Sequence, residues 1–128
     1  MIYFYLFYEH IIFFLGKIAD LSDLVAISII RAGDSLLQNF LQKIPEAKVG
    51  KILIQRNEKT SLPILFYTKL PVISEYSTIF LLDPMLATGG SAVCAVKEIL
   101  EKTQVKKNYK NFMSKQIKPK FRKKLMIN

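Results

Sequence analysis

The segment Asp83–Ser91 concentrates residue types that bind phosphate groups. It reads Asp-Pro-Met-Leu-Ala-Thr-Gly-Gly-Ser and lies between a hydrophobic run and a segment whose apolar residues have helical spacing. The N-terminus of a helix presents unpaired N–H groups and the positive end of the helix dipole, and glycine lets an anion approach the backbone closely. We therefore predict an anion cradle at Gly89 and Gly90, to which the hydroxyls of Thr88 and Ser91 add hydrogen bonds.

Asp83 follows the hydrophobic run Thr78–Leu82, and the carboxyl end of a strand is where open α/β sheets bind ligands. A carboxylate would repel a phosphate, so we expect Asp83 to face another part of the ligand, such as the hydroxyls of a ribose. A simpler alternative is that the two glycines only form a turn and that Ser91 only caps the following helix.

Two arginines elsewhere could contact other anionic groups of the same ligand. Arg31, Ala32 and Gly33 follow a strand-like run, where Arg31 supplies a cation and Gly33 allows close backbone approach, and Arg56 begins a polar turn. Each signal is weak alone, because an arginine in a turn is usually a solvated charge. Asp34 adds negative charge beside Arg31, and we expect it to weaken anion binding unless a metal intervenes.

The elements that must position these residues follow from hydrophobic periodicity. Continuous β-branched runs are typical of buried parallel strands, and apolar residues three and four apart are typical of helices. We expect strands at Leu24–Ile30 and Thr78–Leu82, helices at Ser35–Ile44 and Ser91–Lys102, and a hairpin of Lys48–Gln55 with Ile64–Lys69. This order predicts an α/β fold with a mostly parallel open sheet, helical crossovers and a β-hairpin insertion.

The segment Asp83–Ser91 resembles the motif with which uracil phosphoribosyltransferases bind phosphoribosyl pyrophosphate (PRPP). The resemblance extends in family order to four more segments, which are Ile30–Gly33, Ile44–Gly50, Gln55-Arg56 and Tyr67–Pro71. It covers residues 24–102 and implies a phosphoribosyltransferase-like, Rossmann-like sheet that is incomplete at both ends.

The resemblance implies a cytoplasmic enzyme of pyrimidine salvage that transfers ribose 5-phosphate from PRPP to uracil, giving UMP and pyrophosphate. It implies that Thr88–Ser91 hold the 5-phosphate, that Asp83 contacts the ribose and that Arg31 and Arg56 hold the pyrophosphate, with Mg²⁺ assisting. Asp83 and Arg31 are then the catalytic residues, and no residue is assigned as a protein ligand of a metal. The PRPP-binding set is Arg31, Ala32, Gly33, Arg56, Asp83, Pro84, Met85, Leu86, Ala87, Thr88, Gly89, Gly90 and Ser91.

The two ends of the chain have a different character. The net charge of +9 comes entirely from residues 103–128, which hold nine basic and no acidic side chains, whereas residues 1–102 hold ten of each. We expect a flexible basic tail that could bind RNA or an anionic surface, after a domain at residues 23–102. Residues 1–22 form an aromatic and apolar segment, which we expect to be buried, covered by a partner or associated with a membrane.

Several classes of function are disfavoured. The apolar run at residues 1–15 contains Glu9 and His10 and is too short for a membrane span. Cys94 is the single cysteine, which excludes an internal disulfide, and one histidine gives no support to a Ser-His-Asp mechanism. Two alternatives to the enzyme remain. One is a non-catalytic module that binds PRPP, nucleotide or RNA, and the other is an inactive gene fragment that lacks the uracil-binding segment. Homo-oligomers are common in the family that the chain resembles.

Overall fold

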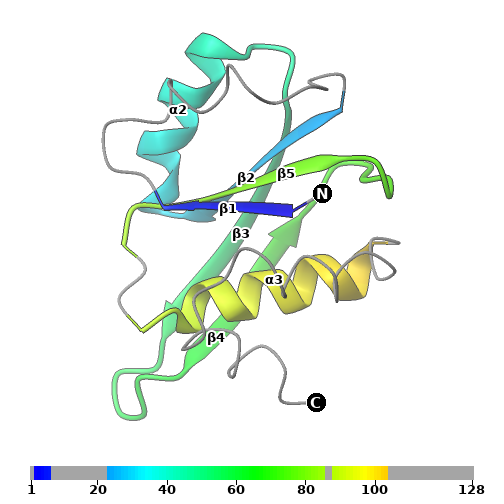
Figure 1. Cartoon of the computed structure of the whole chain (residues 1–128). Helices are drawn as coiled ribbons and strands as arrows, with labels where there is room; N and C mark the ends of the chain where they lie inside the picture. The colour runs from blue at the N-terminus through cyan, green and yellow to red at the C-terminus, as the bar shows by residue number, and fades with distance from the viewer. Residues whose placement is uncertain (1, 7–22, 86–87, 104–128) are drawn as a thin grey trace.

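The computed structural model describes residues 2–6, 23–85 and 88–103, with the side chains described from residue 23 onward. The elements in chain order are β1 Ile2–Leu6, β2 Leu24–Ile30, α2 Gly33–Lys43, β3 Lys48–Arg56, β4 Pro63–Lys69, β5 Thr78–Asp83 and α3 Gly90–Lys102 (Figure 1). Each element predicted from periodicity is present, with ends that differ by at most two residues. Strand β1 was not predicted, because its continuous aromatic run shows no alternation. The expected basic tail lies outside the described residues beyond Thr103.

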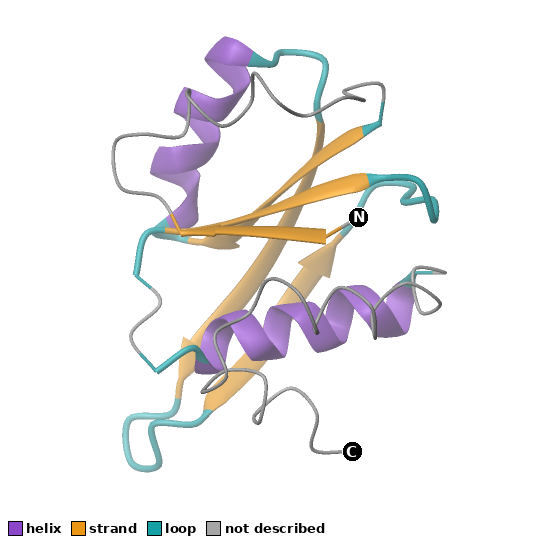
Figure 2. Cartoon of the chain, viewed as in Figure 1, coloured by secondary structure: helices purple, strands orange, loops and turns teal. Residues whose placement is uncertain are grey.

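The strands form one sheet in the order β1-β5-β2-β3-β4. The first four run parallel, and β4 returns antiparallel to β3 as the second arm of the hairpin (Figure 2). The expected open, mostly parallel α/β sheet with a hairpin is therefore confirmed. Because the four parallel strands share one direction, their carboxyl ends meet at one edge of the sheet.

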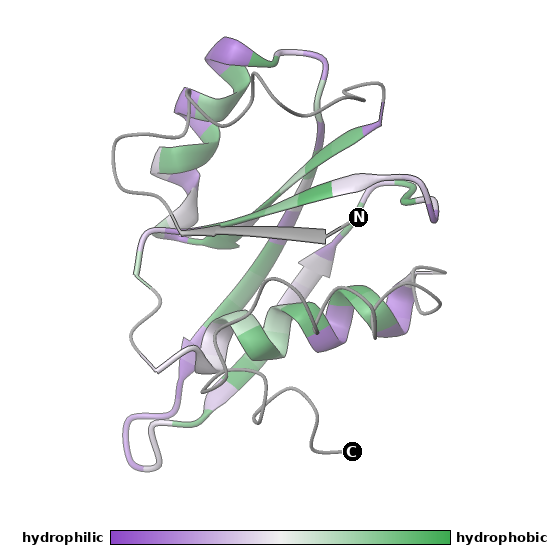
Figure 3. Ribbon diagram, in the orientation of Figure 1, coloured by the Kyte–Doolittle hydropathy of each residue, from purple (hydrophilic) through white to green (hydrophobic). Residues whose placement is uncertain are grey.

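Helices α2 and α3 cover opposite faces of the sheet (Figure 1). Alternate residues of β2 and β5 point to opposite sides, as the geometry of a strand requires. One face packs on α3 through Val25, Ile27, Ile79, Leu81, Ala95, Val96 and Ile99. The other packs on α2 through Leu24, Ala26, Leu37, Phe40, Ile44, Phe80 and Leu82. Both faces of the central strands are thus mostly apolar, which explains why β2 and β5 are largely hydrophobic (Figure 3).

The turn of the hairpin is held by Asn57. Its side-chain oxygen accepts hydrogen bonds from the backbone N–H groups of Lys59 and Thr60 at 2.9 and 3.0 Å. Its own N–H donates to the carbonyl of Leu62 at 2.9 Å, which closes the turn. An asparagine that bonds the backbone two or three residues onward is a common turn former. This turn fixes Arg56, the last residue of β3, at the edge where the parallel strands end.

Asp23 ties together the opposite edge of the sheet, where β2, β3 and β5 begin. Its carboxylate accepts hydrogen bonds from Lys48 at 2.7 Å, Ser77 at 2.6 Å and Ser74 at 2.9 Å. The bonds from Lys48 and Ser77 lower the pKa of Asp23 from 3.8 to about 2.

This network predicts a pH-dependent stability. A lowered pKa means that the stabilisation is complete above pH 4 and is lost as the pH falls toward 2. Since solvent screens part of the carboxylate, Asp23→Asn should lower the free energy of unfolding by about 1 kcal/mol at pH 7. Urea unfolding at pH 7 and near pH 2 measures the difference, which should shrink at the lower pH. An equal difference at both pH values would contradict the prediction.

Within the described part of the chain, neither helix is a candidate membrane span.

Candidate functional site

Three predicted site residues lie at the edge where the parallel strands end. Arg31 directly follows β2, Asp83 is the last residue of β5, and Arg56 is the last residue of β3. Strands β5, β2 and β3 are consecutive neighbours in the sheet. Their parallel pairing brings to one edge residues that are up to 52 positions apart in the sequence. The order of the strands in the sheet therefore places Arg31, Arg56 and Asp83 at the same edge.

Gly33 permits a close approach between the start of α2 and the end of β5. A Cβ atom at this position would lie 2.3 Å from the carbonyl oxygen of Leu82 and 2.8 Å from the hydroxyl of Ser28. Both distances are shorter than a van der Waals contact, so only glycine fits here without movement of the backbone. The start of α2 therefore lies against the end of β5, directly beside Asp83.

The N-terminus of α3 is arranged as an anion site. Its N-cap is Gly89, which has a left-handed backbone (φ 73°) and provides no side-chain hydrogen bond to the helix. The first turn of α3 holds no acidic residue. Ser91 is the second residue of the helix, so the alternative that it serves as the N-cap is wrong. The N-cap residue consequently offers the first N–H groups of α3 no side-chain acceptor, and the helix dipole adds positive potential there.

The hairpin contacts the loop that precedes α3. One guanidinium nitrogen of Arg56, Nη2, donates to the Thr88 hydroxyl at 3.3 Å. A Cβ at Gly90 would lie 3.7 Å from the ring of Pro63, the first residue of β4. Arg56 and Pro63 are partners in the β3–β4 ladder, so the two contacts adjoin. A cation is thus held beside the N-terminus of α3.

Asp83 is half-buried and shapes the beginning of the same loop. Its Oδ1 atom accepts a hydrogen bond from the N–H of Met85 at 3.1 Å, which turns the chain after Pro84. Within the described residues, its other oxygen accepts no hydrogen bond. The side chain of Met85 is 74% exposed. Leu86 and Ala87 lie outside the described residues.

Arg31 is exposed, and its side chain forms no hydrogen bond or ion pair with another described residue. Ala32, also exposed, is the N-cap of α2 and provides no side-chain bond to it. The neighbouring Asp34 was expected to weaken anion binding. The structure shows that its carboxylate is bonded to Ser28 at 2.7 Å and to Lys51 at 3.0 Å. The Asp34 charge is therefore paired, while its effect on anion binding stays a prediction.

Lys51 and Ser28 were missed by sequence reasoning. Neither belongs to a motif, and both lie inside strands. The register of β2 with β3, in which Ser28 is the partner of Lys51, places both residues next to Asp34. No local pattern specifies that register.

Among the described residues, no group of three or more His, Cys, Asp or Glu side chains could hold a metal ion. Asp83, at the end of β5, has no ion pair with a lysine among the described residues. A divalent cation would therefore need most of its ligands from a substrate or from water. Mg²⁺ suits such a site, because it keeps several waters and is commonly bound by one or two carboxylates together with phosphate oxygens.

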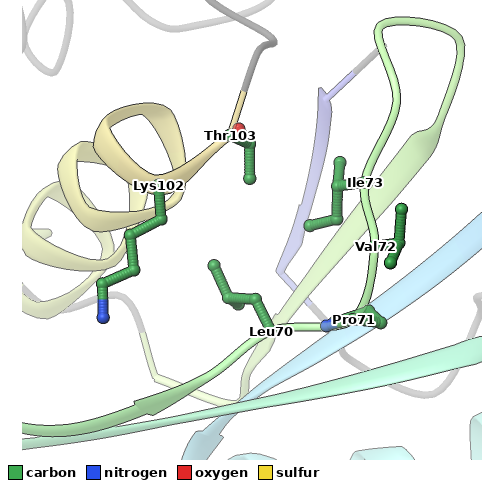
Figure 4. A pocket seen from close by; sticks show the side chains of 6 residues that line it. All are labelled: Leu70, Pro71, Val72, Ile73, Lys102 and Thr103. Atoms are coloured by element: carbon green, nitrogen blue, oxygen red, sulfur yellow. The ribbon is translucent and has the colours of Figure 1, made fainter.

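The hollow in Figure 4 lies elsewhere. It has a volume of about 530 Å³ and is lined by Leu70, Pro71, Val72, Ile73, Lys102 and Thr103. Lys102 ends α3, about 20 Å along the helix from Gly90 at the usual rise per residue. Its amine is paired with Glu98 at 2.8 Å. The hollow is therefore separate from the anion site, and its charged side chain is already neutralised.

Comparisons with known proteins agree on one family. The family model described as "Uracil phosphoribosyltransferase" matches residues 13–110. The uracil phosphoribosyltransferase of Saccharomyces cerevisiae is 50% identical over 93 residues, which are 73% of this chain and 40% of that protein. That of Dictyoglomus thermophilum is 46% identical over 81 residues, which are 63% and 39% of the two proteins.

A solved structure agrees with the fold. The structure of the AQ2163 protein from Aquifex aeolicus superposes with a TM-score of 0.58 at 45% identity, over 61% of this chain and 37% of that one. The chain spans about 40% of the length of the curated relatives described above. The matched region holds both arginines and the loop of Asp83, and the family model covers more than half of the residues. On this evidence, the chain belongs to the uracil phosphoribosyltransferase family.

Proposed function

We propose that this edge of the sheet binds PRPP and forms the donor side of a transfer of ribose 5-phosphate to uracil, which yields UMP and pyrophosphate. The observation that carries the proposal is the N-terminus of α3, which has a glycine N-cap and no acid in its first turn, with Arg56 bonded to Thr88 beside it. Helix N-termini of this kind bind phosphate through N–H groups and the helix dipole. Membership of the family supplies the identity of the ligand.

Each group of PRPP has a counterpart at this edge. The 5-phosphate is assigned to Thr88–Ser91, at the start of α3, and the ribose hydroxyls to Asp83. The pyrophosphate is assigned to the exposed Arg31 with the backbone of Ala32 and Gly33, and to Arg56. Pro84, Met85, Leu86 and Ala87 form the intervening part of the loop. The sheet order supports this assignment, because β2 and β3 bring the arginines to the end of β5.

The proposed reaction needs no nucleophilic side chain. Departure of pyrophosphate breaks the bond from C1 of the ribose to oxygen and leaves positive charge on the ribose. The acceptor nitrogen of uracil then forms the new bond to C1, and its proton passes to the released pyrophosphate or to water. The protein contributes by positioning the two reactants and by neutralising the leaving anion. Arg31 and Arg56 neutralise the pyrophosphate, and the carboxylate of Asp83 holds the ribose next to the developing positive charge.

Mg²⁺ belongs to the same proposal. The Asp83 carboxylate suits a cation that binds together with the pyrophosphate oxygens, with Asp83 as its neighbour on the protein. When bound, the cation would add further charge neutralisation on the leaving group. A cytoplasmic location and a homo-oligomeric assembly are proposed by analogy with the family. Binding of RNA or an anionic surface stays a prediction from the charge of residues 103–128, and those after Thr103 lie outside the described residues.

Titration calorimetry with PRPP and Mg²⁺ tests binding, and formation of labelled UMP from uracil tests transfer. We expect PRPP binding that Asp83→Asn weakens about tenfold through loss of a charged hydrogen-bond acceptor. Glu46→Gln is the matched control, because this exposed carboxylate follows the C-terminal end of α2, away from the site.

The outcomes separate the two parts of the proposal. Binding together with UMP formation supports the whole reaction. Binding without turnover restricts the protein to a PRPP-binding role and contradicts the transfer. No binding of PRPP by the folded wild-type chain would contradict both parts.

A further inference from the structure

Asp34 places a negative charge close to the proposed pyrophosphate site. It lies in the first turn of α2, three residues after Arg31, to which the pyrophosphate is assigned. Its N–H donates to the carbonyl of Arg31 at 3.1 Å, so the backbone holds the two residues together. Charged side chains three residues apart in a helical turn are close enough to pair. Left alone, Asp34 would compete with a ligand for Arg31 or repel the ligand itself.

Two side chains from the sheet hold the Asp34 carboxylate in another direction. Ser28 donates to Oδ1 at 2.7 Å, and Lys51 donates to Oδ2 at 3.0 Å, so each oxygen has its own partner. Ser28 is fully buried, and the side chains of Lys51 and Asp34 are 42% and 37% exposed. The bonds from Ser28 and Lys51 lower the pKa of Asp34, which keeps the carboxylate ionised and paired.

The packing around this pair fixes its geometry. Ser28 and Lys51 are partners across the β2–β3 ladder, so both project from the same place on the sheet. Gly33, directly before Asp34, is pressed against Leu82 and Ser28. The backbone from Arg31 to Asp34 therefore cannot move far from the sheet. With the backbone held there, the partner of the Asp34 carboxylate decides whether Arg31 is available.

We propose that Lys51 is a positioning residue of the PRPP site, which holds the Asp34 carboxylate against β3 so that Arg31 remains free to bind the pyrophosphate group. This inference rests on the proposed function. The structure supports it because Arg31 has no side-chain partner among the described residues and lies three residues from an acid that is engaged by Ser28 and Lys51. Lys51 acts through Asp34 and does not itself contact the ligand.

The test measures PRPP affinity by titration calorimetry with Mg²⁺ in four variants and the wild type. Lys51→Met leaves Asp34 without its cation, and we expect Kd to rise about fivefold, as for loss of a partly exposed ion pair. Adding Asp34→Asn to Lys51→Met should return Kd to within about twofold of the wild type, because the competing charge is gone. Asp34→Asn alone should bind at least as tightly as the wild type.

Lys69→Met is the matched control. Lys69 lies opposite Lys51 in the β3–β4 ladder, is exposed and has no ion pair among the described residues. The Lys69→Met substitution removes one positive charge from the same part of the sheet. We expect the Kd of this variant for PRPP to match that of the wild type. A rise equal to that of Lys51→Met would mean that general charge loss explains the effect, which overturns the inference.

The remaining outcomes are also decisive. Wild-type affinity in Lys51→Met, or a double variant as weak as Lys51→Met, would overturn the inference while leaving the proposed function intact. Absence of PRPP binding by the wild type would overturn the proposed function and this inference with it. If Lys51→Met does not fold by circular dichroism, Asp34→Asn decides, since weaker binding by that variant would show that the carboxylate itself is needed.

Discussion

Gly33→Ala is expected to destabilise the fold by about 3 kcal/mol and to remove PRPP binding. The added methyl would meet the Leu82 carbonyl oxygen at 2.3 Å and the Ser28 hydroxyl at 2.8 Å. Neither atom can yield easily, because Leu82 lies in a central strand and Ser28 is bonded to Asp34. The start of α2 would have to move away from β5, which separates Arg31 from Asp83. Urea unfolding and PRPP titration measure the two effects.

Gly90→Ala is the matched control for stability. A Cβ there would be 3.7 Å from Pro63 and from the Thr88 hydroxyl, which is ordinary contact. Since alanine favours helices more than glycine does, the free energy of unfolding should change by less than about 1 kcal/mol. If the two alanine variants were equally stable, the close approach at Gly33 would not limit the fold.

Arg31→Ala is expected to raise the Kd for PRPP about 10- to 100-fold, since a charged hydrogen bond contributes about 1.5–3 kcal/mol. The side chain is exposed and unpaired among the described residues, so its loss should leave the free energy of unfolding nearly unchanged. Arg31→Lys should recover only part of the affinity, because lysine cannot offer two parallel donors to a phosphate. Calorimetric titration with PRPP and Mg²⁺ gives the values.

Lys43→Ala provides the charge-matched control for Arg31. Lys43 is exposed in the last turn of α2, at the opposite end of the helix from Arg31. We expect no change of affinity beyond about twofold, because solvent and salt screen a charge at that distance. Equal losses in both variants would indicate an effect of net charge and would remove the role assigned to Arg31.

The core elements could be predicted from the sequence because their signals are local. Leu24–Ile30 is hydrophobic at every position except Ser28, and a strand covered by α2 on one face and α3 on the other requires a continuous apolar run. The spacing from Leu36 to Ile44 marks the buried side of α2 directly. Strand β1 gave no such signal, because an apolar run without alternation suits a strand, a helix or an interface equally.

The candidate site could be predicted only in part, because some of its contacts depend on tertiary structure and leave no local signal in the sequence. Arg31, Arg56 and the loop after Asp83 each follow a recognisable strand, so the shared edge was foreseeable. The bond from Arg56 to Thr88 depends on how the hairpin lies against α3, which no local pattern encodes. The pairing of Lys51 with Asp34 depends on the β2–β3 register. A charge that looked harmful in the sequence is neutralised by a residue 17 positions away.

The placement of α2 and α3 on opposite faces has a consequence for how the site can change. Strands β2 and β5 are neighbours, yet the chain leaves β2 toward one face and β5 toward the other. Adjacent strands with such diverging exits form a topological switch point, where open sheets leave room for a ligand. Apart from the close approach at Gly33, the segments that follow β2 and β5 lead to different faces of the sheet. Substitutions at exposed loop positions such as Met85 can therefore alter ligand preference while the two apolar layers, and with them the stability of the fold, remain as they are.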